Sequence, residues 1–200
     1  MITPADAVAF QRCVADGGVA VFPADTVYGL ACRPDSASAI ARLYAIKGRQ
    51  PDKPAAVMFF DLRLALAAVP ELGPRTTMAL EQLLPGAVTA LVENPADRFP
   101  LACGPDRLTL GLRVPRLDGA LATVDEPVLQ SSANMSGGPD PRRLDDVPEQ
   151  IRGAVDMVLD AGELPGTPST VIDLRGYEQG TWSIVREGAV DRATVERALS

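Results

Sequence analysis

Apolar residues along the chain form short continuous runs and longer segments with helical spacing. The continuous runs predict buried strands, and they lie at residues 19–22, 55–60, 87–92, 108–114, 127–130, 155–159, 169–174 and 182–186. The segments with helical spacing predict helices, and they lie at residues 4–16, 36–46, 61–68, 74–84, 116–124, 149–154 and 191–199. A further apolar patch at 28–32 follows the first strand. Residues 94–106, which are rich in proline, predict a surface loop.

Strands that alternate with helices predict an α/β fold. We find no internal repeat and no linker between separate parts of the sequence. Residues 1–200 are therefore predicted to form a single domain with a twisted, open, mixed sheet and flanking helices.

The composition of the chain excludes several kinds of catalytic and binding site. The chain has no histidine, which excludes Ser-His-Asp and Cys-His triads, and its cysteines lack zinc-ligand spacing. The net charge of -7 argues against a broad nucleic-acid-binding face, which needs clustered cations. Three scattered cysteines (Cys13, Cys32 and Cys103) are typical of thiols in a reducing compartment, and no apolar run approaches the roughly 20 residues of a membrane helix. We therefore expect a cytoplasmic protein.

The only two lysines, Lys47 and Lys53, lie with Arg49 in one loop after the helix predicted at 36–46. Such a cluster in an acidic protein predicts an anion site, with lysine as a compact charge and arginine as a fork. Cations at a helix end also suit the helix dipole. That explanation covers Lys47 and partly Arg49, but not Lys53, which lies beyond Pro51.

Polar residues at the ends of other strands are further candidates. Thr26 follows the first strand, and Ser132 and Asn134 lie in a Ser/Gly-rich loop whose small side chains let backbone N–H groups approach a phosphate. On the residues alone, a plain turn explains both loops better than a binding site does. Thr109 and Arg113 lie four residues apart on one strand and so share a face, although such a pair can simply face water.

Five segments resemble the YrdC family, whose best-understood members are threonylcarbamoyl-AMP synthases. In the expected order they are PADTVYGL (23–30), KGRQPDKP (47–54), SSANMSG (131–137), STVID (169–173) and SIVREG (183–188). The resemblance covers nearly the whole chain. It implies a sheet with a concave face and, at this length, the short form without the extra C-terminal domain of longer members.

The resemblance also implies roles for particular residues. The positions that match ATP-binding residues are Lys47, Arg49, Lys53, Thr109, Ser132, Asn134 and Arg186. The positions that match L-threonine-binding residues are Thr26, Arg113 and Ser169. No catalytic side chain is implied. Mg²⁺ is expected to accompany ATP, and Asp25 and Asp173 are among the acids that could hold it, without an assigned set of ligands.

The activity implied is the joining of L-threonine, bicarbonate or CO2, and ATP into threonylcarbamoyl-AMP and pyrophosphate. A tRNA-modifying complex would then use the product, without direct RNA binding by this chain. Two departures from the family pattern keep alternatives open: Ala24 replaces a threonine, and Met58 replaces a histidine found in some relatives. The alternatives are a paralogue with a changed or lost activity, such as another amine substrate or carbamoyl transfer, and an RNA-binding protein of the same fold.

Overall fold

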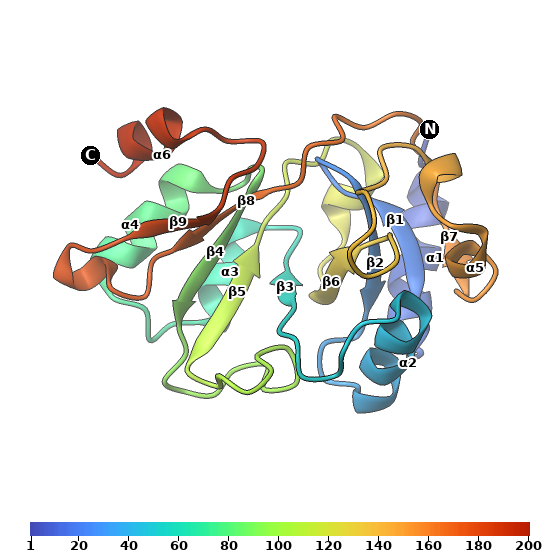
Figure 1. Cartoon of the computed structure of the whole chain (residues 1–200), viewed down its shortest axis with the longest axis horizontal. Coiled ribbons are helices and arrows are strands. Elements are labelled where there is room, and N and C mark those ends of the chain that lie inside the picture. Colours follow the sequence, from blue (N-terminus) through green and yellow to red (C-terminus); the bar gives the residue numbers. More distant parts are fainter.

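The computed structural model describes residues 1–200 and contains one nine-stranded mixed sheet with flanking helices (Figure 1). The strands are β1 (Ala20–Pro23), β2 (Tyr28–Cys32), β3 (Ala56–Met58), β4 (Val88–Glu93), β5 (Thr109–Arg113), β6 (Val128–Ser132), β7 (Met157–Val158), β8 (Thr170–Asp173) and β9 (Ser183–Arg186). The α-helices are α1 (Pro4–Ala15), α2 (Ala37–Lys47), α3 (Leu62–Ala68), α4 (Pro74–Leu83), α5 (Glu149–Arg152) and α6 (Arg192–Ala198). Across the sheet the strand order is β7-β1-β2-β6-β3-β5-β4-β8-β9.

Local sequence explains where several helices begin and end. Side-chain oxygens of Thr3, Ser36, Asp61 and Asp191 accept hydrogen bonds from backbone N–H groups in the first turns of α1, α2, α3 and α6. Helix α2 ends at Gly48, whose φ of 61° lies in the left-handed region that favours glycine. This ending turns the chain directly into the loop that carries the predicted anion-binding residues.

Three predictions for individual elements are corrected. The apolar patch at 28–32 is a full strand, β2, because it pairs with both β1 and β6. The helix predicted at 116–124 is wrong: only the single 3-10 turn η1 (Ala120–Thr123) forms, because Gly119 has a φ of 78° and the N–H of Arg116 donates to Asp25. The strand predicted at 155–159 shortens to the two residues of β7 at one edge of the sheet.

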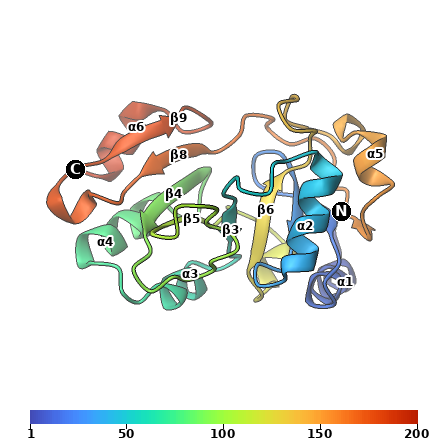
Figure 2. The same cartoon turned by 60° about the horizontal axis from the view of Figure 1, so that its bottom comes forward.

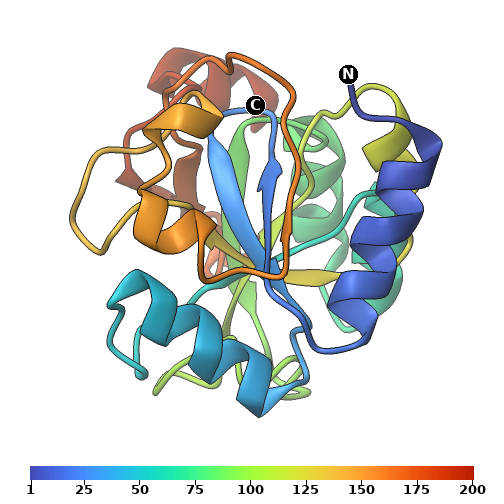
Figure 3. The same ribbon diagram turned by 90° about the vertical axis from the view of Figure 1, so that its right-hand side faces the viewer.

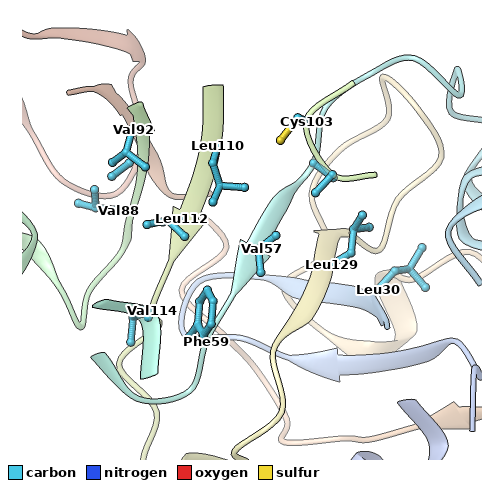
Figure 4. Close-up of a cluster of buried hydrophobic side chains, with 14 of the residues drawn as sticks. Leu30, Val57, Phe59, Val88, Val92, Cys103, Leu110, Leu112, Val114 and Leu129 are labelled. Carbon is cyan, nitrogen blue, oxygen red and sulfur yellow. The ribbon is translucent and has the colours of Figure 1, made fainter. Parts of the chain in front are cut away.

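Alternation along the strands divides the core between the two faces of the sheet. In β1, Val21 belongs to the larger cluster of buried side chains, whereas Phe22 belongs to a smaller cluster under α1. The larger cluster includes residues of α2, α3 and α4 and continues through Val57, Leu110 and Leu112 on the central strands (Figure 4). Burial of these side chains is the main force that holds the sheet against its helices.

The helices cover the two faces unequally. Figure 3 shows α1 and α2 on opposite sides of the strands between them, in agreement with their membership of different clusters. Figure 2 shows α3 and α4 along β4 and β5, at the other end of the sheet. The smaller cluster draws on β1, β2, β3 and β6 but on no residue of β4, β5 or β8. The face of these three strands opposite the larger cluster is therefore available for a site. None of the helices has both the length and the apolar character needed to cross a bilayer.

Candidate functional site

A cavity of about 440 Å³ lies over the central strands and is of a size suited to small-molecule ligands. On β5, Thr109, Gly111 and Arg113 line it, whereas the alternate residues Leu110 and Leu112 are buried in the larger core cluster. The predicted common face of Thr109 and Arg113 is thus confirmed, and it is the floor of the cavity.

Ten residues were singled out from the sequence as ligand-binding, and the fold brings seven of them to this one cavity. The seven are Thr26, Arg49, Thr109, Arg113, Ser132, Ser169 and Arg186. The remaining three, Lys47, Lys53 and Asn134, do not line its wall. Residues separated by up to 160 positions in sequence therefore converge, which a set of unrelated turns would not produce.

At one end of the cavity, Arg113 is held by the loop between β1 and β2. Its Nη2 donates to Asp25 Oδ1 at 2.5 Å and to Thr26 Oγ1 at 2.8 Å. Burial lowers the pKa of the Arg113 guanidinium, and the Asp25 carboxylate opposes that shift by favouring the charged form. Because the Thr26 oxygen accepts this bond, the hydroxyl proton of Thr26 remains available to a ligand.

Beside Arg113, a second polar group is formed by one residue of β4, one residue directly before β8 and one residue of β9. The hydroxyls of Ser169 and Thr89 lie 2.9 Å apart, and Arg186 Nη2 donates to the Ser169 carbonyl oxygen at 2.7 Å. Thr89 lines the cavity but was not predicted from sequence, because one threonine within an apolar run carries no signal of its own. Its register opposite Arg113 on β5 is what places it here.

Arg49 reaches the cavity from the loop after α2. Its Nη2 donates to the Pro54 carbonyl oxygen at 2.6 Å, and its guanidinium lies 5.6 Å from the centre of the Tyr44 ring. The Nε of Arg49 is buried without a partner. Neither Arg49 nor Arg186 forms an ion pair with a carboxylate, so the positive charge of both remains unneutralised within the protein.

Lys47 holds the Ser/Gly-rich loop from behind the cavity wall. Its ammonium donates to the carbonyl oxygens of Ser132 at 2.6 Å and of Asn134 at 2.8 Å, and also to the Asn134 side-chain oxygen. The Lys47 carbonyl oxygen accepts from the N–H of Ser136. Burial, with the nearby charge of Arg49, lowers the pKa of Lys47 to about 8. Lys47 and Asn134, both buried, thus shape the loop that presents Ser132.

The third residue away from the wall, Lys53, has an exposed side chain, and its carbonyl oxygen accepts from Tyr44 Oη at 2.8 Å. Its contact with ATP stays a prediction. At the far end of the cavity, the Thr109 hydroxyl donates to Asp106 and accepts from Arg175 Nη1 at 3.0 Å. Arg175 is a second lining residue that sequence reasoning missed, because it belongs to none of the five segments.

The wall is more positive than the molecule as a whole. Four arginines line it (Arg49, Arg113, Arg175 and Arg186), against two carboxylates (Asp106 and Asp140), in a chain of net charge -7. Converging guanidinium groups with free N–H donors, on a concave and partly apolar surface, suit phosphate and carboxylate groups.

Comparison with known proteins agrees with the order of the five segments. The family model Sua5–YciO–YrdC, described as telomere recombination, matches residues 12–188. The chain belongs to this family. A relative from Chromohalobacter salexigens, a threonylcarbamoyl-AMP synthase, is 32% identical over 177 residues, which cover 87% of this chain and 94% of the relative. Another threonylcarbamoyl-AMP synthase, from Pyrococcus abyssi, is 27% identical over 190 residues, 93% of this chain.

The fold of the family is also shared. The structure of P. abyssi Sua5 complexed with L-threonine matches 99% of this chain with a TM-score of 0.87 and 25% identity. This chain covers 55% of the P. abyssi relative's length and 53% of a Bacillus subtilis relative's length, so it spans about half of these two longer proteins. The predicted α/β fold with a large mixed sheet is confirmed.

The two departures from the Sua5–YciO–YrdC sequence pattern lie beside the cavity, within the apolar layer under α1. Ala24 and Met58 are 3% and 0% exposed and belong to the smaller core cluster, with Phe22 and Phe60. Neither residue lines the cavity. Met58 shares its face of β3 with Ala56, which does line the cavity, so Met58 marks the boundary between packed core and open site.

Proposed function

We propose that the chain is a threonylcarbamoyl-AMP synthase, which converts L-threonine, CO2 or bicarbonate, and ATP into threonylcarbamoyl-AMP and pyrophosphate. The observation that carries the proposal is the single cavity that joins two kinds of anion-binding group. Arg49 and Arg186 offer charge that no carboxylate neutralises, and Arg113 with Thr26 forms a compact subsite for an amino acid. The names of the relatives support the same substrates.

The reaction divides into two steps that need no side-chain nucleophile. The amine of L-threonine bonds to the carbon of CO2 and loses a proton, which gives a carbamate. When bicarbonate supplies the carbon, its C–OH bond breaks and the hydroxide leaves with the amine proton as water. A carbamate oxygen then bonds to the α-phosphorus of ATP, and the bond from this phosphorus to the bridging oxygen breaks as pyrophosphate leaves. The chain supplies position and charge: Arg113 orients the amino acid, and Arg49 and Arg186 stabilise the phosphates.

Mg²⁺ would enter with ATP. No group of three or more His, Cys, Asp or Glu side chains forms a metal cage in the protein. Asp25 and Asp173 each use both oxygens for bonds to arginine side chains or backbone N–H groups. Asp140 lines the cavity, and its carboxylate has neither a hydrogen bond nor an ion pair, so it fits a metal that is held mainly by phosphates and water.

The proposed reaction belongs in the cytoplasm, in keeping with three cysteines that form no disulfide. The product would pass to a tRNA-modifying complex, and the acidic balance gives no support to direct RNA binding. The alternative of a paralogue with another amine substrate depended on Ala24 and Met58. Since neither side chain is on the cavity wall, that alternative has less support than the synthase.

The test is exchange of labelled pyrophosphate into ATP, together with chromatographic detection of the adenylate. We expect both signals to require L-threonine and bicarbonate. The double variant Arg49→Ala, Arg186→Ala should lose at least about 100-fold in kcat/KM for ATP, because each arginine supplies charge-assisted bonds. Exchange that proceeds equally without L-threonine, or a double variant with unchanged activity, would contradict the proposal.

A further inference from the structure

A buried carboxylate stands directly behind the arginine that we assign to the amino acid. The side chains of Arg113 and Asp25 are 4% and 8% exposed, and Asp25 Oδ1 accepts from Arg113 Nη2 at 2.5 Å. The other oxygen, Oδ2, accepts from the backbone N–H of Arg116 at 3.0 Å. Asp25 therefore connects three segments: the loop between β1 and β2, the end of β5, and the chain that follows β5.

Asp25 itself does not line the cavity, whereas its neighbour Thr26 and its partner Arg113 do. Both bonds from Arg113 to this loop leave through one nitrogen, Nη2. Its Nε is buried and has no partner in the protein. Nη1 makes no hydrogen bond in the protein either and, unlike Nε, is not fully buried. The guanidinium is therefore held through Nη2 and keeps a donor for an acceptor from the cavity that Arg113 lines.

We propose that Asp25 is a positioning residue for the amino-acid subsite, which fixes the guanidinium of Arg113 and the hydroxyl of Thr26 so that together they receive the substrate carboxylate. This inference rests on the proposed function. It explains why a carboxylate is buried next to a group that must bind a carboxylate: the pair keeps Arg113 charged and oriented while the site is empty. The substrate then adds to a formed site and does not have to order it, which lowers the cost of binding.

A purely structural ion pair is the competing explanation, and the two predict different kinetics. If Asp25 only stabilises the fold, its loss should lower the melting temperature and the amount of active enzyme, with similar KM values for both substrates. If Asp25 positions Arg113, its loss should raise the KM for L-threonine selectively. The KM for ATP should stay within about twofold, because Arg49 and Arg186 make no bond to Asp25.

The experiment compares Asp25→Asn, Asp25→Ala and Asp25→Glu with the unmodified chain in the pyrophosphate-exchange assay. Asn keeps the size and one acceptor but removes the charge, so we expect the L-threonine KM to rise about tenfold, with a larger rise for Ala. Glu retains the carboxylate on a longer stem and should restore part of the loss. Asp35→Asn is the matched control, because Asp35 also pairs with an arginine, Arg33, but on the exposed surface away from the cavity.

Binding supplies a second readout that does not require turnover. Calorimetric titration of L-threonine in the presence of ATP should show the same weakening for Asp25→Asn, and L-threonine amide, which lacks the carboxylate, should bind weakly to every form. An Asp25→Asn chain that is folded and has an unchanged L-threonine KM and Kd would overturn the positioning role alone. An unmodified chain that neither turns over nor binds L-threonine would overturn the subsite and the proposed function together.

Discussion

Replacement of Lys47 by methionine tests whether this lysine supports the cavity wall or contacts the ligand. Methionine has a similar length and no charge, so the change removes the ammonium from three close acceptors on Ser132 and Asn134. Each bond from a charged donor contributes about 1.5–3 kcal/mol, whereas holding the ammonium charged at a pKa of about 8 costs roughly 3 kcal/mol. Three such bonds contribute about 4.5–9 kcal/mol, which less that cost leaves about 1.5–6 kcal/mol. We therefore expect Lys47→Met to lose at least about 1.5 kcal/mol of unfolding free energy.

For a chain of this size, a loss of about 1.5 kcal/mol corresponds to a melting temperature lower by about 3–6 °C, and a larger loss lowers it further. Urea unfolding followed by circular dichroism measures the free energy, and pyrophosphate exchange measures the activity. Lys53→Met is the matched control for stability, because Lys53 is the only other lysine and its side chain is exposed. We expect it to change the unfolding free energy by no more than about 0.5 kcal/mol.

The activity of Lys47→Met should fall together with its stability, since Ser132 and Asn134 lose their bonds to the ammonium and only the backbone bond from Ser136 N–H to the carbonyl oxygen of residue 47 still ties this loop to α2. A variant as stable as the unmodified chain would refute the claim that the three bonds of the Lys47 ammonium stabilise the fold by more than the burial of its charge costs. A destabilised variant with an unchanged KM for ATP, measured well below its melting temperature, would refute the view that Lys47 acts on ATP binding through the loop that presents Ser132.

Three further predictions concern pH and single side chains. Between pH 8 and about 10.5, Lys47 keeps its proton in the unfolded state and releases it in the folded state, so its contribution to stability rises with pH. The difference in unfolding free energy between the unmodified chain and Lys47→Met should therefore grow across this window. A difference that stays constant would exclude a lowered pKa of Lys47. Arg49→Lys should raise the KM for ATP about tenfold despite the conserved charge, because lysine cannot both donate to the Pro54 carbonyl and fork toward a phosphate; wild-type kinetics would disprove this. Thr89→Val removes the hydroxyl that Ser169 contacts and should raise the KM for L-threonine about threefold to tenfold with the KM for ATP unchanged, and an equal effect on both values would point to general damage.

The sequence predicted the structure best where a local pattern of residues was sufficient to place a side chain. Two-residue alternation on β5 was enough to place Thr109 and Arg113 on one face, and the structure makes that face the cavity floor. The helices predicted to begin at Ser36 and Asp61 begin one residue later, with these two residues as N-caps, because the cap bond is local. The resemblance supplied most site residues, and seven of its ten assignments meet at one cavity.

Features that depend on distant parts of the chain were out of reach. Strand β2 was only an apolar patch in the sequence, because its pairing with β1 and β6 defines it as a strand. Lys47 and Lys53 looked alike as members of one basic loop, yet Lys47 is buried by a loop about 85 residues further on, and Lys53 is exposed. Asp25 was named only among the acids that could hold Mg²⁺, because its partner Arg113 lies 88 residues away.

The separation of charges between wall and interior explains how an acidic chain can serve anionic substrates. At physiological ionic strength, surface charges beyond about 8 Å are largely screened, so the net charge of -7 matters less to a bound anion than the groups it touches. Those groups are arginines tied to backbone carbonyl oxygens, as in Arg49 with Pro54 and Arg186 with Ser169, which fix a guanidinium without neutralising it. The carboxylate of Asp25 is used differently: it holds Arg113, the one arginine here buried deeply enough that its charge needs a partner even when no substrate is bound. Under the proposed function, the two anionic ligands are distinguished by how each arginine is held, with free charge for the phosphates and a partly compensated, oriented guanidinium for the smaller carboxylate.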